Sequence, residues 1–242
     1  MGVAWLCCLP ASGAPYRFVT LDYPPYEYEE NGQVKGIAVD IVRETFKQMG
    51  KEVTIEVYPW ARSIEMFQDG EADGIFTFFK TAERETYTRF SREALITQAI
   101  SLWVPRTSRL ESALPLARLS AYTFGVVHMT SYGSLFDGMV RSAALRTDES
   151  YTVESCINNL LLGRFDIWVN NHYGAVYALR KAGKADEVRE LTPPIQEPAS
   201  YVGFSRKRKL DALRDEFDRN LVLLRRSDRY QKIINSYMDA LK

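Results

Sequence analysis

The chain has 242 residues, with 31 Lys and Arg against 31 Asp and Glu, so its formal net charge at pH 7 is zero. Hydrophobic residues make up 46% and charged residues 26%, the balance of an ordinary globular protein with one large domain or two smaller ones. Because nucleic-acid-binding domains normally carry a basic excess, we expect no nucleic-acid partner.

Residues 1–14 differ from the rest of the chain. Residues 3–9 form a short apolar run, and the small residues Ser12 and Ala14 fit the cleavage site of a signal peptide. The run is too short to span a membrane. The basic residues that begin such signals are missing, so we expect residues 1–14 to be a signal peptide with a truncated start. A disordered or poorly defined N-terminus is the alternative.

The number and positions of the cysteines limit the disulfides and lipid anchors that the chain can form. Removing residues 1–14 would leave Cys156 as the single cysteine, so the mature chain could form no internal disulfide. Cys156 lies in an apolar helical stripe, and we expect it in the core. The bulky residues before Cys8 disfavour a lipid anchor there.

The first half of the chain alternates strand and helix patterns. Short apolar or alternating runs predict strands, amphipathic stripes predict helices, and glycines mark helix ends. We expect strands over residues 16–21, 53–57 and 75–79, helices over residues 38–49 and from Pro59 to Gly70, and a hairpin through Asn31-Gly32. This order predicts parallel βαβ units.

A polar turn, residues 80–84, follows the buried strand over residues 75–79. Open α/β sheets bind ligands just past the C-terminal ends of such strands. Arg84 in this turn carries N–H donors whose fixed geometry matches a carboxylate. We therefore expect the turn to contact a ligand.

The second half repeats the pattern. We expect a strand over residues 124–127, a helix from Met129-Thr130-Ser131 to about Leu145, a helix over residues 153–161 and a strand over residues 167–169. The unit helix–Gly–x–x–Asp–strand occurs twice, at Gly70/Asp73 and at Gly163/Asp166. This repetition predicts two similar lobes.

Two strand-like segments, residues 98–107 and 191–204, are expected to cross between the lobes, and residues 210–241 predict helices only. If these helices pack on the first lobe, residues 15–103 and 196–242 form lobe 1, and residues 104–195 form lobe 2. We expect a two-lobed α/β fold of the type II periplasmic-binding-protein kind. Each lobe would hold a mainly parallel sheet flanked by helices, with a two-segment hinge and the ligand site between the lobes.

Four motifs in order resemble family 3 extracellular solute-binding proteins, the periplasmic receptors of polar amino-acid ABC importers. The motifs are Tyr23-Pro-Pro-Tyr-Glu-Tyr28, Gly36-Ile-Ala-Val-Asp40, Gly70-Glu-Ala-Asp73, and Thr81-Ala-Glu-Arg84 followed by Phe90-Ser91. The resemblance covers the chain from about Tyr16 to Leu241. It implies two α/β lobes that close on a ligand.

The resemblance assigns roles in lobe 1 position by position. Arg84, in the motif that begins at Thr81, matches the arginine that holds the ligand α-carboxylate. The alternative is a surface arginine paired with Glu83 or Glu85. Tyr23 matches an aromatic that stacks on the ligand, and Trp60 stands where the family often has a second one; either could instead be core.

In lobe 2, Thr130 and Ser131, with Met129 beside them, match residues whose amides and hydroxyls hold the carboxylate. A helix N-terminus presents free N–H groups and partial positive charge to an anion, which agrees with that role. Simple helix capping by Thr130 or Ser131 is the alternative.

Two departures from the family concern the ligand ammonium. Near Thr77 and Phe79 the family usually has glycine and a small hydroxyl residue, and Phe79 removes a hydroxyl acceptor. The family aspartate that binds the ammonium aligns with Asn171, which carries no charge. A hydrogen bond to a charged group is worth about 1.5–3 kcal/mol against about 1 for a neutral one. Selection for an α-amino group is therefore expected to be weaker.

Four further residues are candidate readers of a ligand side chain. His128, His172 and Tyr173 lie near these loops, although a lone histidine is more often a satisfied polar residue. Arg62, near Trp60, could provide a second cation for a dicarboxylate.

We expect a monomeric periplasmic receptor that delivers a small carboxylate-bearing solute, an amino acid or a related compound, to the membrane permease of an ABC importer. No cofactor or metal is expected. One alternative is a ligand-sensing partner of a membrane signalling receptor. Another is a dehydratase-like enzyme on the same fold, but no nucleophile–base set stands out.

Overall fold

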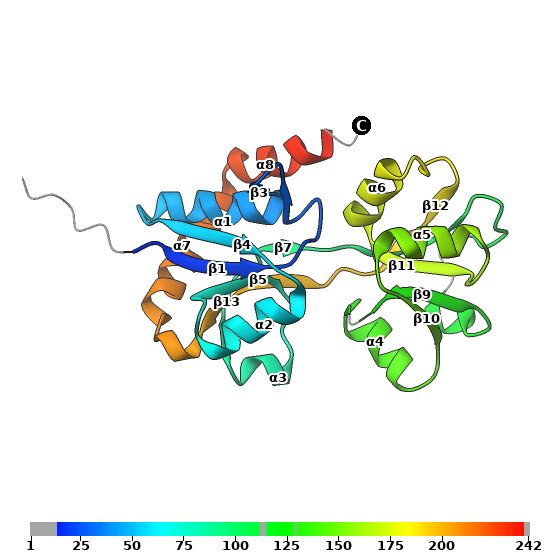
Figure 1. The fold of residues 1–242 in the computed structure, drawn as a ribbon, viewed down its shortest axis with the longest axis horizontal. Helices are drawn as coiled ribbons and strands as arrows, with labels where there is room; N and C mark the ends of the chain where they lie inside the picture. Colours follow the sequence, from blue (N-terminus) through cyan, green and yellow to red (C-terminus); the bar gives the residue numbers. More distant parts are fainter. Residues whose placement is uncertain (1–13, 112–114, 129, 240–242) are drawn as a thin grey trace, which may run out of the picture.

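The computed structural model describes residues 14–111, 115–128 and 130–239. Within them, the chain forms two α/β lobes side by side along the long axis of the molecule (Figure 1). Residues 1–13 of the expected signal peptide, and Met129 of the expected site, lie outside the described residues.

Lobe 1 is built on a mixed sheet in which three parallel strands lie at one side. The strand order is β4 (Val53–Val57), β1 (Tyr16–Thr20), β5 (Gly74–Phe78), β13 (Ala199–Ser205) and β6 (Thr88–Phe90), with β7 (Ile96–Thr97) also pairing with β13. β1 runs parallel to β4 and β5, whereas β13 is antiparallel to its neighbours. The expected hairpin is confirmed: β2 (Tyr28–Glu30) and β3 (Gln33–Lys35) flank Asn31 and Gly32, whose φ angles are 54° and 73°.

Both faces of this sheet are covered by helices. Phe18 and Val19, neighbours on β1, are both fully buried and enter different core clusters, because side chains alternate along a strand. The Phe18 cluster includes residues of α1 (Ile37–Gln48), α7 (Asp211–Arg226) and α8 (Asp228–Asp239), and the Val19 cluster includes α2 (Trp60–Asp69). A short helix, α3 (Ala82–Glu85), follows β5.

Lobe 2 has the same plan. Its strand order is β10 (Arg146–Ser150), β9 (Thr123–Val127), β11 (Ile167–Asn171), β8 (Ile100–Pro105) and β12 (Val188–Gln196). The first three are parallel, and β8 and β12 are antiparallel to their neighbours. Helix α4 (Ser134–Arg141) packs in one core cluster, while α5 (Val153–Leu161) and α6 (His172–Lys181) pack in the other. Cys156 is fully buried in the second cluster, as expected.

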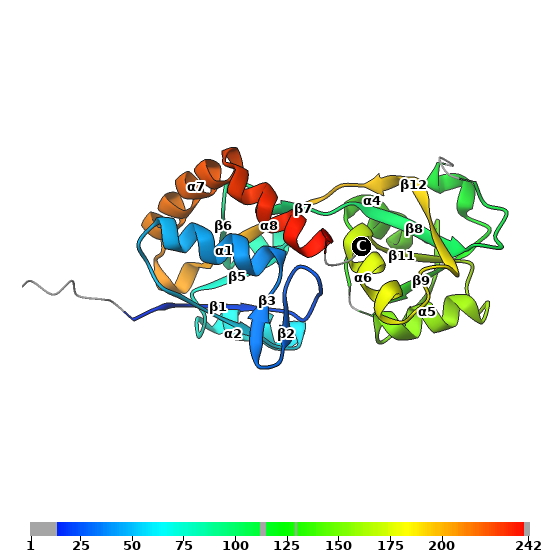
Figure 2. The ribbon, with the colours of Figure 1, turned by 90° about the horizontal axis from the view of Figure 1, so that it is seen from above.

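Two short segments connect the lobes and lie beside one another. Residues 98–99 join β7 to β8, and residues 197–198 join β12 to β13; the Gln98 N–H donates to the Pro198 carbonyl at 3.0 Å. The first crossing therefore lies before Ile100, not after residue 103, because β8 pairs with β11 and β12 of lobe 2. Figure 2 shows these connections from above.

The repeated Gly–x–x–Asp unit has the same structure in both lobes. Asp73 Oδ2 accepts from the Arg17 N–H at 2.9 Å, and its own N–H donates to the Arg17 carbonyl at 2.7 Å. Asp166 Oδ2 accepts from the Thr123 N–H at 2.8 Å, and its N–H donates to the Thr123 carbonyl at 3.0 Å. In each lobe the aspartate thus fixes its own strand against the neighbouring parallel strand.

The expected helix over residues 129–145 is wrong at both ends. Helix α4 begins at Ser134, after Gly133 at φ 94°, where an added Cβ would clash with the side-chain amide of Gln196. It ends at Arg141, and Ala143, at φ 57°, turns the chain toward β10. Strand β10 and helix α6 were not expected, and β5 ends at Phe78, one residue earlier than expected.

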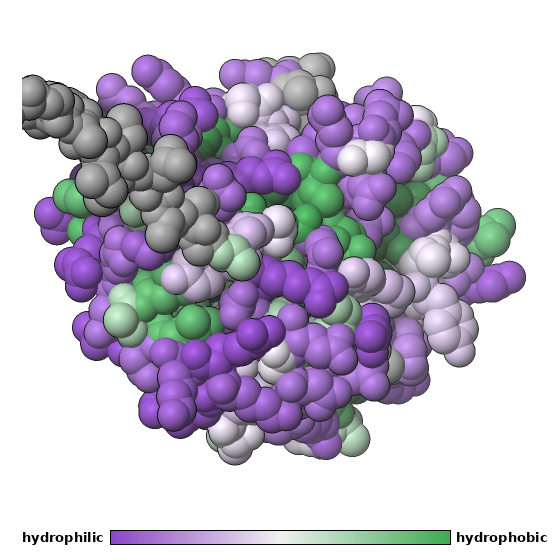
Figure 3. All heavy atoms as spheres, turned by 60° about the vertical axis from the view of Figure 1, so that its left-hand side comes forward, coloured by the Kyte–Doolittle hydropathy of each residue, from purple (hydrophilic) through white to green (hydrophobic). Residues whose placement is uncertain are grey.

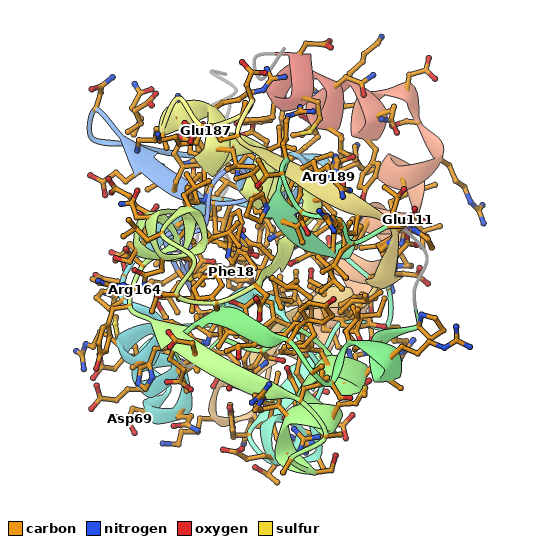
Figure 4. The ribbon with its side chains drawn as sticks, turned by 90° about the vertical axis from the view of Figure 1, so that its right-hand side faces the viewer. Phe18, Asp69, Glu111, Arg164, Glu187 and Arg189 are labelled. Carbon is orange, nitrogen blue, oxygen red and sulfur yellow. The ribbon has the colours of Figure 1, made fainter. Side chains whose placement is uncertain are left out.

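The face of the molecule seen in Figure 3 is mostly hydrophilic. In the view of Figure 3, hydrophilic residues surround smaller hydrophobic areas. Figure 4 labels the fully buried Phe18 near the middle of the view and the exposed Asp69 and Arg164 near its margin. Among the described residues, no helix combines the length and apolar character needed to cross a membrane.

Candidate functional site

The two lobes face one another through the C-terminal ends of their parallel strands. We call residues 21–23, 58–60 and 79–84, which follow β1, β4 and β5, the lobe 1 edge. Residues 128–133, 151–152 and 171–173, at the ends of β9, β10 and β11, form the lobe 2 edge, with residue 129 outside the described part. The edges meet where the amide of Asn171 donates to the hydroxyl of Tyr23. Ligands of α/β sheets bind at this end of the strands.

A row of tyrosines extends this contact. The Tyr23 ring stacks on Tyr26 with centroids 5.6 Å apart, and Tyr26 lies 6.3 Å from Tyr173 of α6. Tyr28 lies 5.9 Å from Tyr177, one helical turn farther along α6. The expected stacking residue Tyr23 and the candidate reader Tyr173 are therefore both at the junction of the lobes.

Arg84 is half-buried and lies against aromatic rings. Its Nη1 donates to the Phe79 carbonyl at 3.0 Å, and its guanidinium carbon is 4.2 Å from the Phe78 ring centre and 5.9 Å from that of Trp60. No carboxylate among the described residues lies within 4.0 Å of its side-chain nitrogens. Pairing with Glu83 or Glu85 is thus not observed, and burial lowers the pKa of Arg84.

The turn that carries Arg84 is fixed locally. The Thr81 hydroxyl accepts from the Arg84 N–H at 3.2 Å and so caps α3. Trp60 opens α2 and meets Phe78 edge-on at 5.6 Å, half-exposed. Phe79 is also half-exposed at this edge. The structure therefore brings Trp60, Phe79, Thr81 and Arg84 together.

Thr77 is buried behind this turn, not presented to it. It adopts φ 54°, and its hydroxyl donates to Glu27 Oε1 at 2.5 Å. Glu27 is fully buried, and burial raises its pKa well above the usual range of a carboxyl. The Glu27 backbone also pairs with Tyr23, so one residue ties the Tyr23 loop to the end of β5.

In lobe 2, Thr130 and Ser131 are exposed and lie in a loop before α4, not in its first turn. Ser131 Oγ donates to Asp137 Oδ2 at 2.5 Å, and the Tyr132 N–H donates to the other oxygen of Asp137 at 3.0 Å. The Leu135 N–H of α4 donates to Gln196 Oε1 at 3.0 Å. This N–H is therefore not free for an anion, and neither Thr130 nor Ser131 is the N-cap.

Asn171 has its hydrogen bonds within the protein. Its Oδ1 accepts from the Gly174 N–H at 2.7 Å and caps α6, while its Nδ2 donates to Tyr23. The amide oxygen expected to meet a ligand ammonium is thus engaged in helix capping.

The family of the chain follows from the match of nearly its whole sequence to one family model. The family model of bacterial extracellular solute-binding proteins, family 3, matches residues 17–240. The chain belongs to this family. No curated protein sequence matches it significantly.

Solved structures similar to this solute-binding protein share its fold. One is a histidine kinase sensor domain with similarity to periplasmic binding proteins, 19% identical, with TM-score 0.78 over 93% of this chain and 96% of that one. Another is the substrate-binding protein of an amino acid ABC transporter, 20% identical, with TM-score 0.72 over 93% and 99%. A third is the GluR0 ligand-binding core from Nostoc punctiforme in complex with L-glutamate, 18% identical, with TM-score 0.73 over 93% and 100%.

Both histidines of this solute-binding protein lie at the lobe 2 edge, each beside a glutamate. His128 Nδ1 is 2.5 Å from Glu149, and His172 Nδ1 is 2.9 Å from Glu190. The pKa of Glu190 is lowered: burial opposes ionisation, but the hydrogen bond from His172 and the nearby Ser101 hydroxyl outweigh it. Arg62 is exposed and lies 2.9 Å from Glu65 and 3.7 Å from Glu71, so its charge is already compensated.

Three residues of the inter-lobe region were not predicted. Glu27 lies within the motif Tyr23-Pro-Pro-Tyr-Glu-Tyr28 but was assigned no role of its own. Asn170 directly precedes Asn171, which was the expected site residue. Asn170 is only 3% exposed, its Oδ1 accepts from the Asn171 N–H at 3.0 Å, and its Nδ2 has no partner. Tyr151 follows β10 at the lobe 2 edge and is 83% exposed, 5.4 Å from the His128 ring. No sequence pattern distinguishes these residues from their neighbours.

Two surface hollows lie elsewhere on the solute-binding protein. One, of about 520 Å³, is lined by residues such as Phe46, Lys47 and Lys51 of lobe 1, and one of about 270 Å³ by residues such as Trp103, Arg106 and Arg180 of lobe 2. Both are open, and each is lined by residues of one lobe only, so the facing edges remain the better site. The described residues include no cluster of three or more His, Cys, Asp or Glu side chains suited to a metal ion.

Proposed function

We propose that this solute-binding protein closes its lobes on a small polar solute that carries a carboxylate. The observation that carries this proposal concerns Arg84. Its guanidinium is half-buried at the lobe 1 edge, where α/β sheets bind ligands, and it has no carboxylate partner among the described residues. Removing a charge from water is unfavourable unless an opposite charge compensates it. A ligand carboxylate facing Arg84 would supply that charge in a bidentate geometry.

Closure would occur at the two crossings, residues 98–99 and 197–198, the only described segments that join the lobes. A ligand held by Arg84 gains further contacts when the lobe 2 edge, with Thr130, Ser131 and Tyr151, comes nearer. Because these contacts exist only in the closed form, the ligand shifts the equilibrium toward closure. Trp60 and Tyr23 would flank the ligand, with His128, His172 and Tyr173 as side-chain readers.

We further propose that the protein is exported to the periplasm, acts as a monomer and delivers its solute to the permease of an ABC importer. The family description and the fold shared with the binding protein of an amino acid ABC transporter support this role. The fold shared with a histidine kinase sensor domain supports a second candidate, a ligand-sensing partner of a membrane receptor. Uptake of the labelled solute by cells with and without the gene separates the two, since only transport predicts lost uptake.

Calorimetric titration of wild type and Arg84→Ala with small carboxylates tests the proposal. Hydrogen bonds to charged groups are worth about 1.5–3 kcal/mol, so Arg84→Ala should weaken binding roughly 10-fold to 150-fold. Arg62→Ala is the matched control, because Arg62 is exposed and paired with Glu65 and Glu71. Equal losses in both variants, or none in Arg84→Ala, would contradict the role of Arg84. Analysis of the solute after incubation checks that the protein binds without turnover.

A further inference from the structure

The inter-lobe region holds two side chains with unused hydrogen-bond donors. One is the guanidinium of Arg84 in lobe 1, which carries five N–H donors, donates to the Phe79 carbonyl, interacts with the Tyr87 hydroxyl and forms no ion pair with a carboxylate among the described residues. The other is the Nδ2 amide of Asn170 in lobe 2. The orientation of this amide follows from its neighbour: the Asn171 N–H can only donate, so the Asn170 atom that it contacts, at 3.0 Å, is the oxygen.

Asn170 lies at the junction of the lobes. Its Oδ1 is 3.5 Å from the Tyr23 hydroxyl, and its side chain is only 3% exposed. A buried amide N–H without an acceptor costs about 1–3 kcal/mol. A ligand that brings an acceptor oxygen to Asn170 would remove this cost, whereas a ligand ammonium there would place donor against donor.

The carboxylates near the edges already have partners. Glu149 and Glu190 contact His128 and His172, and Asp137 accepts from Ser131 and from the Tyr132 N–H. Glu27 is fully buried: Thr77 donates to its Oε1, whereas its Oε2 has no partner, and because burial raises the pKa of Glu27 and favours the protonated form, this oxygen would present an O–H donor and not a free acceptor.

Three further acidic residues lie beside the site: Asp22 next to Tyr23, and Glu83 and Glu85 on α3. Asp22, next to Tyr23, is exposed and interacts with the charge of Lys181 from the other lobe. Glu83 and Glu85 are exposed on α3, whereas Arg84 between them lies against Phe78. None of these carboxylates is a buried, unpartnered acceptor for an ammonium group.

We infer that the solute is a carboxylate whose second polar group is a hydrogen-bond acceptor, as in 2-oxo acids or dicarboxylates, and not an ammonium. This inference rests on the proposed function, because it assumes that Arg84 holds the carboxylate. Arg84 and Asn170 then donate to the two ends of one acceptor-rich anion. The engaged amide of Asn171 agrees with this class, since its oxygen already accepts from the Gly174 N–H.

Calorimetry with matched pairs tests the inference. The probes are L-glutamate and 2-oxoglutarate, L-phenylalanine and phenylpyruvate, L-leucine and 4-methyl-2-oxopentanoate, and L-alanine and pyruvate. In the pair whose side chain fits, the 2-oxo acid should bind wild type at least about tenfold more tightly. An amino acid that binds as tightly as its 2-oxo partner would overturn the inference and leave the proposed function standing. Absence of binding by every probe would overturn both.

Asn170→Asp gives an independent test, because it replaces the unpartnered donor by an acceptor and keeps the oxygen that Asn171 and Tyr23 contact. The 2-oxo acid should lose at least about tenfold in affinity, and the preference between 2-oxo and amino acid should shrink or reverse. Asn158→Asp, on the exposed side of α5, introduces the same charge away from the edge and should leave both affinities unchanged. An unchanged preference in folded Asn170→Asp would overturn the inference. If that variant does not fold, the wild-type pairs decide alone.

Discussion

The phenol of Tyr23, directly after β1 in lobe 1, accepts a hydrogen bond from the amide of Asn171, at the end of β11 in lobe 2. The same amide caps α6 through its oxygen. One side chain therefore holds a helix of its own lobe and contacts the opposite lobe, so the lobe junction and the α6 terminus are mechanically connected.

Asn171→Ala should lower the free energy of unfolding by about 1 kcal/mol, because the Gly174 N–H loses its side-chain acceptor. Asn171→Asp should retain most of the stability, since a carboxylate caps a helix as well as an amide does. Urea denaturation of both variants, with Asn158→Ala at an exposed position of α5 as control, measures the difference. If Asn171→Ala matches wild type, the capping role is wrong.

The paired aspartates of the two lobes predict parallel losses of stability. Asp73→Ala removes the acceptor of the Arg17 N–H and should cost about 1–2 kcal/mol. Asp166→Ala does the same to the Thr123 N–H, but Asp166 is exposed, so water replaces part of the bond and the cost should be below about 1 kcal/mol. Denaturation melts report both, with Asp69→Ala, at the exposed end of α2, expected to change little. A larger loss for Asp166→Ala would contradict this ranking.

Glu27 predicts a pH dependence of stability. Because burial raises its pKa in the folded chain, the folded state keeps a proton that the unfolded state loses above about pH 4.3. Stability should therefore fall as pH rises from there toward the folded-state pKa, by up to about 1.4 kcal/mol per pH unit. Glu27→Gln cannot ionise and still offers Thr77 an acceptor, so it should lose less stability than wild type between pH 5 and pH 7.

Chemical denaturation of wild type and Glu27→Gln at the two pH values measures this difference. Glu29→Gln, an exposed neighbour on β2, is the control and should follow wild type. Equal pH dependence in wild type and Glu27→Gln would show that Glu27 is ionised in the folded protein.

Local sequence signals explain what could be predicted of the fold. Asn31-Gly32 accepts positive φ and so marks a hairpin, and Gly70, at φ 78°, ends α2 where an apolar stripe stops. The Gly–x–x–Asp repeat predicts two similar lobes because each aspartate accepts a hydrogen bond from a backbone N–H of the neighbouring strand. Arg84 could be proposed because a polar turn after a buried strand is where α/β sheets bind ligands.

The missed features depend on distant contacts. β10 is a largely exposed edge strand of sequence Arg-Thr-Asp-Glu-Ser, which shows no apolar alternation. The start of α4 is set by Gln196, more than 60 residues away, whose amide bonds the Leu135 N–H and the Tyr132 carbonyl. The roles of Asn170 and Glu27 depend on their burial and on partners in other segments. Residue type and spacing reveal neither.

The most direct test of the central claim is the distance across the site in solution. Spin labels at Glu85→Cys on α3 and Arg141→Cys on α4, both exposed and on the same side of the two lobes in Figure 1, report closure by pulsed electron resonance. The ligand to add is the carboxylate that calorimetry shows to bind. If Arg84 holds that carboxylate and both lobes enclose the ligand, its addition shortens the distance between the labels in a protein with Arg84 intact. The same concentration leaves it unchanged with Arg84→Ala. A bound ligand that does not shorten the distance, or equal shortening with Arg84→Ala, would contradict the account.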